Sequence, residues 1–212
     1  MKVVIIGATG FVGKAIVKEA SDRGLTVTAI ARDVTKVPAL PGVTAVAADV
    51  NDTDLLTGLF KGQDAVISAY NAGWGNPNIY DDFIKGSTAI QTATKAAGVK
   101  RLLVIGGAGS LYIDGKQLVD SPEFPQEWKP GATAARDYLA SLREEQALDW
   151  SFLSPAIELV PGERTAAFRL GLESPVFDAA GKNKISVEDL AVAVINEIEQ
   201  PAHIQKRFTL GY

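Results

Sequence analysis

The chain has 212 residues, 47% of them hydrophobic and 22% charged, a composition typical of a folded globular protein with enough chain for one sizeable core. The formal net charge is −4, from 21 basic and 25 acidic residues, and no basic tract stands out, so neither nucleic acid nor an anionic membrane surface is an expected partner. The absence of cysteine excludes disulfides, thiolate catalysis and thiolate metal sites.

Strand and helix patterns alternate along the chain. The predicted strands are residues 2–6, 26–31, 43–48, 64–69, 101–106, 150–154 and 206–211. The predicted helices are residues 11–23, 53–61, 79–97, 131–147 and 187–199, with Asn51 or Asp52 capping the second helix and Ser186 the last. This alternation predicts an α/β fold of the Rossmann type, in which helices cover both faces of a doubly wound, mostly parallel sheet.

The pattern predicts a single domain over residues 1–212, with the part from about residue 156 onward contributing to the substrate side. An apolar strand begins at Lys2, where a signal peptide would stand, and no apolar run is long enough to span a bilayer. A cytoplasmic location is therefore expected.

The first strand runs directly into the glycine-rich segment GATGFVG at residues 7–13. A sharp turn from strand to helix leaves free N–H groups at the positive end of the helix dipole, which suits a pyrophosphate. Gly7 allows the turn, Gly10 lets phosphate approach the backbone, and Gly13 lets the helix pack closely on the strand. The alternative is a glycine-rich turn without a ligand. The residues predicted to bind a dinucleotide here are Gly7, Thr9, Gly10, Phe11, Val12 and Gly13.

The second strand ends in Arg32 and Asp33. An acid at this point favours NAD because it binds the ribose hydroxyls, whereas a basic side chain favours NADP because it meets the 2′-phosphate. A guanidinium makes paired bonds to phosphate, so Arg32 predicts NADP(H), while Asp33 leaves NAD(H) open. The alternative for Arg32 is a solvated surface residue.

Later strand ends supply further candidates for cofactor binding. Asp49 is positioned to accept a bond from the adenine amino group, or else to cap the next helix, and Val50 to pack on the ring. The remaining candidates are Ser68, Ala69 and Tyr70 after the fourth strand, Gly106 and Gly107 after the fifth, and Pro155 after the sixth. For the last two groups, a sharp turn from strand to loop is the structural alternative.

Two long loops, residues 70–78 and 107–130, also follow carboxyl ends of strands, where α/β sheets bind ligands. Both are rich in aromatic residues that suit a planar substrate, although packing within the loops is the alternative for each of them. The candidates are Tyr70, Trp74, Tyr112, Phe124 and Trp128.

With these residues in place, the chain resembles the short-chain dehydrogenase/reductase superfamily over nearly all of its length. It is most similar to the atypical group of NADH-flavin reductases, related to NmrA-like proteins and to flavin/biliverdin reductase B. The segments that carry the resemblance are GATGFVG (7–13), AAD (47–49), LDWSFLSPA (148–156), PGERT (161–165), ISVEDLAVAVINEIEQPAH (185–203) and RFTLGY (207–212). The resemblance implies an NAD(P)H-dependent oxidoreductase, with FMN or FAD among its substrates.

One departure from the superfamily concerns its Tyr-x-x-x-Lys pair, which relays a proton from the helix after the fifth strand. Counting back from LDWSFLSPA places Ala132 and Arg136 at these positions, and Tyr138 is followed four residues later by Leu142. The usual proton relay is therefore missing. Reduction of a flavin or quinone needs less, because hydride passes directly to a stacked acceptor and water supplies the proton.

Flavin/biliverdin reductase B uses a serine after the fifth strand, a position held here by Gly107, and this resemblance makes the nearby Ser110 the predicted catalytic hydrogen-bond donor. Arg164 is a candidate for a substrate carboxylate or phosphate, or for a surface ion pair with Glu158 or Glu163. The only histidine, His203, is predicted to lie on the surface beyond the last helix, and Glu197 on a solvated face, so no metal is expected.

Two functional classes follow. The first is an NAD(P)H-dependent reductase of a flavin, quinone or similar planar acceptor, and the second is a non-catalytic NAD(P)-sensing regulator like the NmrA proteins. An epimerase or dehydratase is a third alternative, but it needs the tyrosine that the chain lacks. By analogy with the fold class, a homodimer is compatible with either function.

Overall fold

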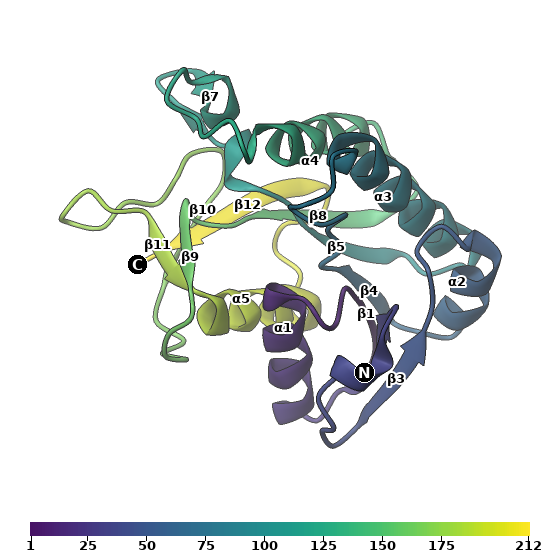
Figure 1. Cartoon of the computed structure of the whole chain (residues 1–212). Coiled ribbons are helices and arrows are strands. Elements are labelled where there is room, and N and C mark those ends of the chain that lie inside the picture. The colour runs from purple at the N-terminus through teal and green to yellow at the C-terminus, as the bar shows by residue number, and fades with distance from the viewer.

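The computed structural model describes residues 1–212 and contains one eight-stranded sheet in the order β10-β12-β8-β5-β4-β1-β2-β3 (Figure 1). Neighbouring strands are parallel except β10 and β12, which are antiparallel. The strands are β1 (Lys2–Ile6), β2 (Thr26–Ala31), β3 (Val43–Ala47), β4 (Ala65–Ser68), β5 (Arg101–Ile105), β8 (Asp149–Ser154), β10 (Arg169–Gly171) and β12 (Lys206–Gly211). This arrangement confirms the predicted Rossmann-type fold.

Five α-helices cover the two faces of the sheet. They are α1 (Phe11–Asp22), α2 (Thr53–Phe60), α3 (Ile79–Ala96), α4 (Lys129–Leu142) and α5 (Val187–Glu199). In Figure 1, α1 and α5 lie on one face, and α2, α3 and α4 lie on the other. Asp52 and Ser186 cap α2 and α5 with side-chain oxygens that accept from Leu55 and Asp189, as the sequence predicts for these two caps.

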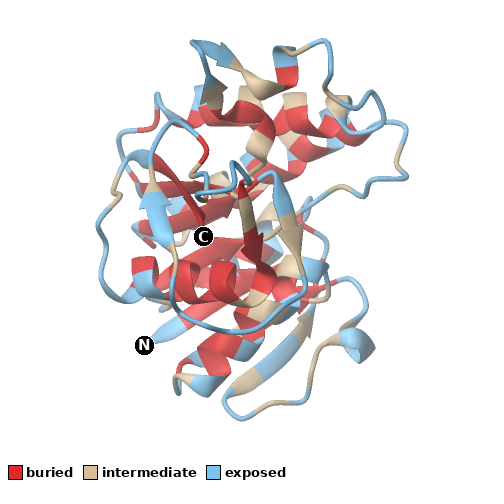
Figure 2. Cartoon of the chain, turned by 90° about the vertical axis from the view of Figure 1, so that its left-hand side faces the viewer, coloured by how far each residue is buried: buried red, intermediate tan, exposed pale blue.

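The core has two halves because successive strand residues point to opposite faces. In β1, Val3 and Ile5 belong to the cluster under α1 and α5, and Val4 and Ile6 to the cluster under the other helices. Both faces of β1 are covered, so its β-branched residues form an uninterrupted apolar run. Figure 2 shows the burial concentrated on the central strands and the inner faces of the helices.

The chain contains short elements that the sequence does not predict. They are the hairpin of β6 (Tyr112–Ile113) and β7 (Lys116–Gln117), the parallel pair of β9 (Glu158–Val160) and β11 (Lys184–Ser186), and the 3₁₀ turns Val34–Lys36, Ala108–Ser110 and Leu118–Asp120. Strand β10 was also unforeseen. No helix is long and apolar enough to cross a membrane.

The predicted helix over residues 131–147 is wrong at its end, because α4 stops at Leu142. Glu145 explains the early stop, since its carboxylate accepts the N–H of Ala147 and its carbonyl accepts the indole N–H of Trp150. These bonds hold the chain in a turn that leads directly into β8.

Candidate dinucleotide-binding cleft

A cleft of about 360 Å³ lies beyond the carboxyl ends of β1, β2, β3 and β4. Strands β2 and β4 flank β1 on opposite sides, so this is the point where the winding of the sheet reverses and where α/β proteins bind nucleotides. The predicted cofactor residues in its wall are Gly7, Thr9, Gly10, Arg32, Asp49, Val50, Ala69 and Tyr70. The wall also contains the polar residues Asn71, Asn76 and Asp82; Asn76 and Asp82 were not predicted, although their position after the fourth strand was a usable signal.

The glycine-rich turn is fixed by close backbone contacts. Gly7 has a φ of 77°, and a Cβ on it would overlap the carbonyl oxygen of Ala69. A Cβ on Gly13 would overlap the carbonyl oxygen of Gly7, which shows how tightly α1 is packed against the end of β1. Gly10 has only one neighbour within 4 Å of an added Cβ, at 3.3 Å, and it faces the cleft.

Helix α1 begins without a side-chain cap. Gly10 is its N-cap and supplies no side-chain bond, and no acid lies in the first turn. The backbone N–H groups of Phe11, Val12 and Gly13 also have no backbone acceptor. The side chain of Phe11 is exposed and that of Val12 packs on the core, so these residues offer backbone donors. Such an uncapped helix end fits the pyrophosphate of a dinucleotide.

Arg32 and Asp33 face different surroundings. Arg32 lines the cleft, and none of the ion pairs of the structure includes it. Asp33 accepts the N–H and the hydroxyl of Thr35, at 3.1 and 2.6 Å, and pairs with Lys36. These bonds lower the pKa of Asp33, with the Thr35 hydroxyl contributing most. The basic residue is therefore available at the cleft, and the acid is engaged elsewhere.

Asp49 lies in the cleft wall but does not cap α2, a role taken by Asp52. Its carboxylate accepts the backbone N–H and side-chain amide of Asn51, at 2.8 and 2.9 Å. These bonds, the backbone one first, lower the pKa of Asp49. The carboxylate is thus held ionised as an acceptor beside the buried side chain of Val50.

Tyr70 forms the wall on the β4 side. Its ring lies 6.0 Å from that of Phe83, its hydroxyl donates to the carbonyl of Asp82, and Gly86 has no room for a side chain because the ring fills the space. Burial raises the pKa of Tyr70. Ser68 is buried one residue before Ala69 and is not part of the cleft wall, contrary to its prediction as a cofactor contact.

Gly106, Gly107 and Pro155 are half-buried and lie outside the cleft wall, along the same edge of the sheet at the ends of β5 and β8. A Cβ on Gly106 would overlap the ring of Phe152, so packing alone requires this glycine. These residues line the direction in which the nicotinamide half of a dinucleotide would extend from the cleft.

Ser110 does not face the cleft. Its side chain is completely buried, and its Oγ lies 3.0 Å from the Gly107 carbonyl, 3.0 Å from Ser154 Oγ and 3.2 Å from a guanidinium nitrogen of Arg207. The prediction of Ser110 as a catalytic donor to substrate is therefore not supported, because its hydroxyl is enclosed and fully bonded within the protein.

The residues counted against the Tyr-x-x-x-Lys pair lie on α4. Tyr138 is buried, bonded to Ser87 and Gln91, and burial raises its pKa. Arg136 pairs with Asp120 and Asp137, and Ala132 is buried. Tyr138 and Arg136 are thus engaged in contacts within the protein.

The predicted aromatic residues of the long loops differ in exposure. Trp74 and Trp128 are more than half exposed. The Trp74 ring lies against Gly131 in the first turn of α4, where an added Cβ would be 2.8 Å from the ring. The other two pack within the protein: Tyr112 is half-buried over the Arg207 guanidinium, and Phe124 contacts the Gly109 region.

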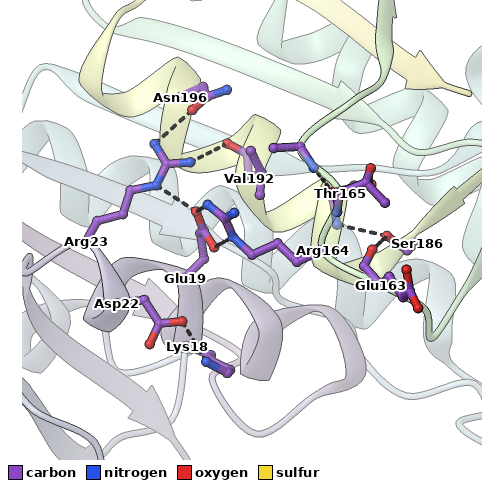
Figure 3. A network of polar contacts seen from close by, with 12 residues as sticks. Lys18, Glu19, Asp22, Arg23, Glu163, Arg164, Thr165, Ser186, Val192 and Asn196 are labelled. Carbon is purple, nitrogen blue, oxygen red and sulfur yellow. Dashed lines mark hydrogen bonds and ion pairs between the residues drawn. The ribbon is translucent and has the colours of Figure 1, made fainter.

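Arg164 lies outside the wall of the cleft, and its guanidinium is held against Glu19 of α1, as Figure 3 shows. It makes two bonds, of 2.6 and 2.8 Å, to the buried carboxylate of Glu19 on α1, which Arg23 also contacts at 2.7 Å. The predicted ion pair with Glu158 or Glu163 is wrong, because the guanidinium is bonded to Glu19 instead, and the wall of the cleft lends no support to a substrate role. Glu19 needs both arginines because burial of a carboxylate is costly without charged donors, and the Arg164 bond contributes most to lowering its pKa.

We expect Arg164→Ala to lower the free energy of unfolding by about 1 kcal/mol, because Arg164 is half exposed and Arg23 still pairs with Glu19. NADPH affinity should be unchanged. Urea unfolding measures the first effect, and Lys18→Ala is the matched control, since its pair with Asp22 on the same helix is exposed. A loss of cofactor binding in Arg164→Ala would contradict this structural role.

The expected solvated face at Glu197 is also a wrong prediction. Glu197 is buried and pairs with Arg101 at 3.0 Å and with His203 Nδ1 at 2.7 Å. The His203 ring stacks on Phe208, with centroids 4.5 Å apart, so it is largely covered. This network lies at the start of β5, at the opposite end of the sheet from the cleft, and no group of His, Asp or Glu residues forms a metal site.

The fold and the uncapped glycine turn define a dinucleotide-binding protein of the Rossmann type. A family model described as NAD(P)H-binding matches residues 7–201, and the chain belongs to this family. The resemblance to the atypical group of short-chain dehydrogenases/reductases is thereby confirmed.

Relatives match the chain over its full length. "Uncharacterized protein YwnB" of Bacillus subtilis is 39% identical over 99% of this chain and 98% of its own. A solved structure named "putative epimerase", from Bacteroides thetaiotaomicron, is 45% identical, with a TM-score of 0.93 over 100% of this chain and 96% of its own. Another, named "a putative NADH-flavin reductase", from Streptococcus pneumoniae, is 37% identical, with a TM-score of 0.85 over 100% and 99%.

Proposed function

We propose that the chain is an NAD(P)H-dependent oxidoreductase that prefers NADPH and passes hydride to a flavin, a quinone or a similar planar acceptor. The observation that carries this proposal is the cleft, in which the uncapped start of α1 and the unpaired Arg32 face the same space. The free N–H groups bind the pyrophosphate, and Arg32 binds the 2′-phosphate of NADPH. Asp49 and Val50 hold the adenine.

The loops that follow β4 and β5 support a planar, electron-poor substrate. Two exposed tryptophans, Trp74 and Trp128, lie on loops that follow the carboxyl ends of β4 and β5, where they offer flat apolar surface. A bound reduced nicotinamide supplies hydride, and the protein holds the two rings face to face. The relative named as an NADH-flavin reductase is consistent with this class of acceptor, which includes FMN and FAD.

The burial of Ser110 and Tyr138 favours this reaction over an epimerisation. An epimerase or dehydratase of this superfamily needs a tyrosine base beside the nicotinamide, and Tyr138 is enclosed between α3 and α4. The same burial favours the second candidate function, an NAD(P)-sensing regulator that binds the cofactor without turnover. Hydride transfer to a flavin needs no protein acid, so the reductase remains the proposal.

The test combines binding with turnover. Purified protein is titrated with NADPH and with NADH, and NADPH oxidation is followed with FMN, FAD and menadione in turn. We expect NADPH to bind more tightly and at least one acceptor to be reduced well above the rate without enzyme. Tight binding with no turnover of any acceptor would favour the sensor, and no binding of either dinucleotide would refute both functions.

A further inference from the structure

Arg207 is a fully buried arginine near the start of β12, beside Phe152 of β8. One guanidinium nitrogen, Nη1, donates to the carbonyl oxygen of Ser110 at 2.5 Å and lies 3.2 Å from its hydroxyl. The other, Nη2, donates to the carbonyl of Glu173 at 3.2 Å and pairs with its carboxylate. The guanidinium also lies 5.5 Å from the centre of the Tyr112 ring. One side chain therefore joins the segment after β5 to the segment after β10.

Ser110, which Arg207 holds in place, is in turn bonded to Gly107. Its hydroxyl donates to the Gly107 carbonyl at 3.0 Å, and its backbone N–H reaches the same oxygen at 3.4 Å. Because a serine hydroxyl has one proton, Ser154 is then the donor in the 3.0 Å contact between the two hydroxyls. Ser154 is the last residue of β8 and precedes Pro155. The two strand ends expected to flank the nicotinamide are thus tied to each other and to Arg207.

A buried charge is a costly way to hold a loop. Burial lowers the pKa of Arg207, Nε has no hydrogen-bond partner, and the counter-ion Glu173 is half exposed. An apolar side chain would fill this space at lower cost in desolvation. It would leave the Ser110 carbonyl with only the 3.3 Å bond from the Gln117 amide, and the Gly107 peptide would lose the support that Arg207 gives through Ser110.

We propose that Arg207 is a positioning residue for the nicotinamide ring. Through Ser110, it fixes the Gly107 peptide and the end of β8, which together form the surface that the ring contacts. This inference rests on the proposed function, since it assumes that the nicotinamide half of NADPH lies beside Gly107. It also gives the segment from residue 156 onward a part in the site, because both Arg207 and Glu173 belong to it.

The test compares two ligands with the full chain: NADPH, and its adenosine bisphosphate fragment, which carries no nicotinamide. We expect Arg207→Gln to lower the affinity for NADPH by about tenfold and the affinity for the fragment by less than about twofold. The reason is that the substitution displaces only the surface that the nicotinamide ring contacts. The kcat/KM for menadione should fall by at least about tenfold as well. Arg207→Lys keeps the charge but loses the planar fork, so its loss should be intermediate.

Arg101→Gln is the matched control. Arg101 is also buried, also has an unpartnered Nε, and ties β5 to Glu197. Arg101→Gln should lower the Tm but leave the affinities for NADPH and for the fragment unchanged. Both affinities are measured below the Tm of each variant. Wild-type NADPH binding in Arg207→Gln, or the same selective loss in Arg101→Gln, would overturn the proposal.

Two further outcomes remain decisive. If Arg207→Gln does not fold, Arg207→Lys and Glu173→Gln carry the same comparison. If the wild-type chain binds NADPH but reduces no acceptor, the reductase proposal fails, while the ratio of the two affinities still supports or overturns the role of Arg207.

Discussion

Gly10→Glu should abolish NADPH binding while leaving the fold intact. An added Cβ at Gly10 would meet only the Gly7 carbonyl, at 3.3 Å, a tight contact that a small shift of the turn relieves. The new carboxylate would enter the cleft at the start of α1, where the pyrophosphate is expected. Repulsion between like charges costs several kcal/mol, so we expect NADPH affinity to fall by about 100-fold or more. Isothermal titration of NADPH and the Tm of the variant measure the two effects.

Two controls separate charge from packing. Gly10→Ala adds the Cβ without charge, and it should keep most of the NADPH affinity. Gly13→Ala should instead lose stability, because its Cβ overlaps the carbonyl oxygen of Gly7 between α1 and β1. If Gly10→Glu bound NADPH as tightly as the wild-type chain, the cleft would not be the pyrophosphate site.

The first half of the fold is predictable from the sequence because its signals are local. β1, β2 and α1 follow from runs of β-branched residues, a glycine turn and an amphipathic pattern, and the strand bounds 2–6 and 26–31 agree with the structure. Their order in the sheet follows from the rule that crossovers are short and right-handed. These local signals also predict the position of the cleft, because the carboxyl ends of parallel strands meet at one edge of the sheet.

The region from residue 155 to 186 was harder to predict because its strands have three residues each and pair with distant partners. β9 pairs with β11, and β10 adds antiparallel to β12 near the end of the chain. An alternation of apolar and polar residues cannot be recognised over three residues. Such a strand is therefore defined only by its pairing with the partner strand.

The polar residues whose surroundings were predicted wrongly also owe them to partners distant in the sequence. Ser110 is enclosed by Arg207, 97 positions further along the chain, and Glu197 is buried by Arg101, 96 positions earlier. Arg164 is drawn to Glu19 across 145 positions. A polar residue in a sequence is expected to be solvated unless a distant partner compensates its burial, and that partner cannot be identified from local pattern.

Arg32→Ala should change the choice of cofactor more than the ability to bind one. Arg32 lines the cleft without an ion pair, so its guanidinium is available for the phosphate that distinguishes NADPH from NADH. A hydrogen bond to a charged group contributes about 2 kcal/mol, which corresponds to a loss of about 30-fold in NADPH affinity. NADH has no group at this position, and its affinity should stay within about threefold. Titrations with both dinucleotides, at one fixed salt concentration, give the ratio.

Asp33→Ala is the control on the neighbouring residue. Asp33 caps the Val34–Lys36 turn through Thr35 and lies outside the cleft wall, so its removal should loosen that turn and leave the ratio of NADPH to NADH affinity unchanged. Equal losses of both dinucleotides in Arg32→Ala would show that Arg32 supports the cleft without contacting the phosphate. A shift toward NADPH in Asp33→Ala would show instead that the acid reaches the ribose. The structure favours an unchanged affinity ratio in Asp33→Ala, because the Asp33 carboxylate is already bonded to Thr35 and Lys36.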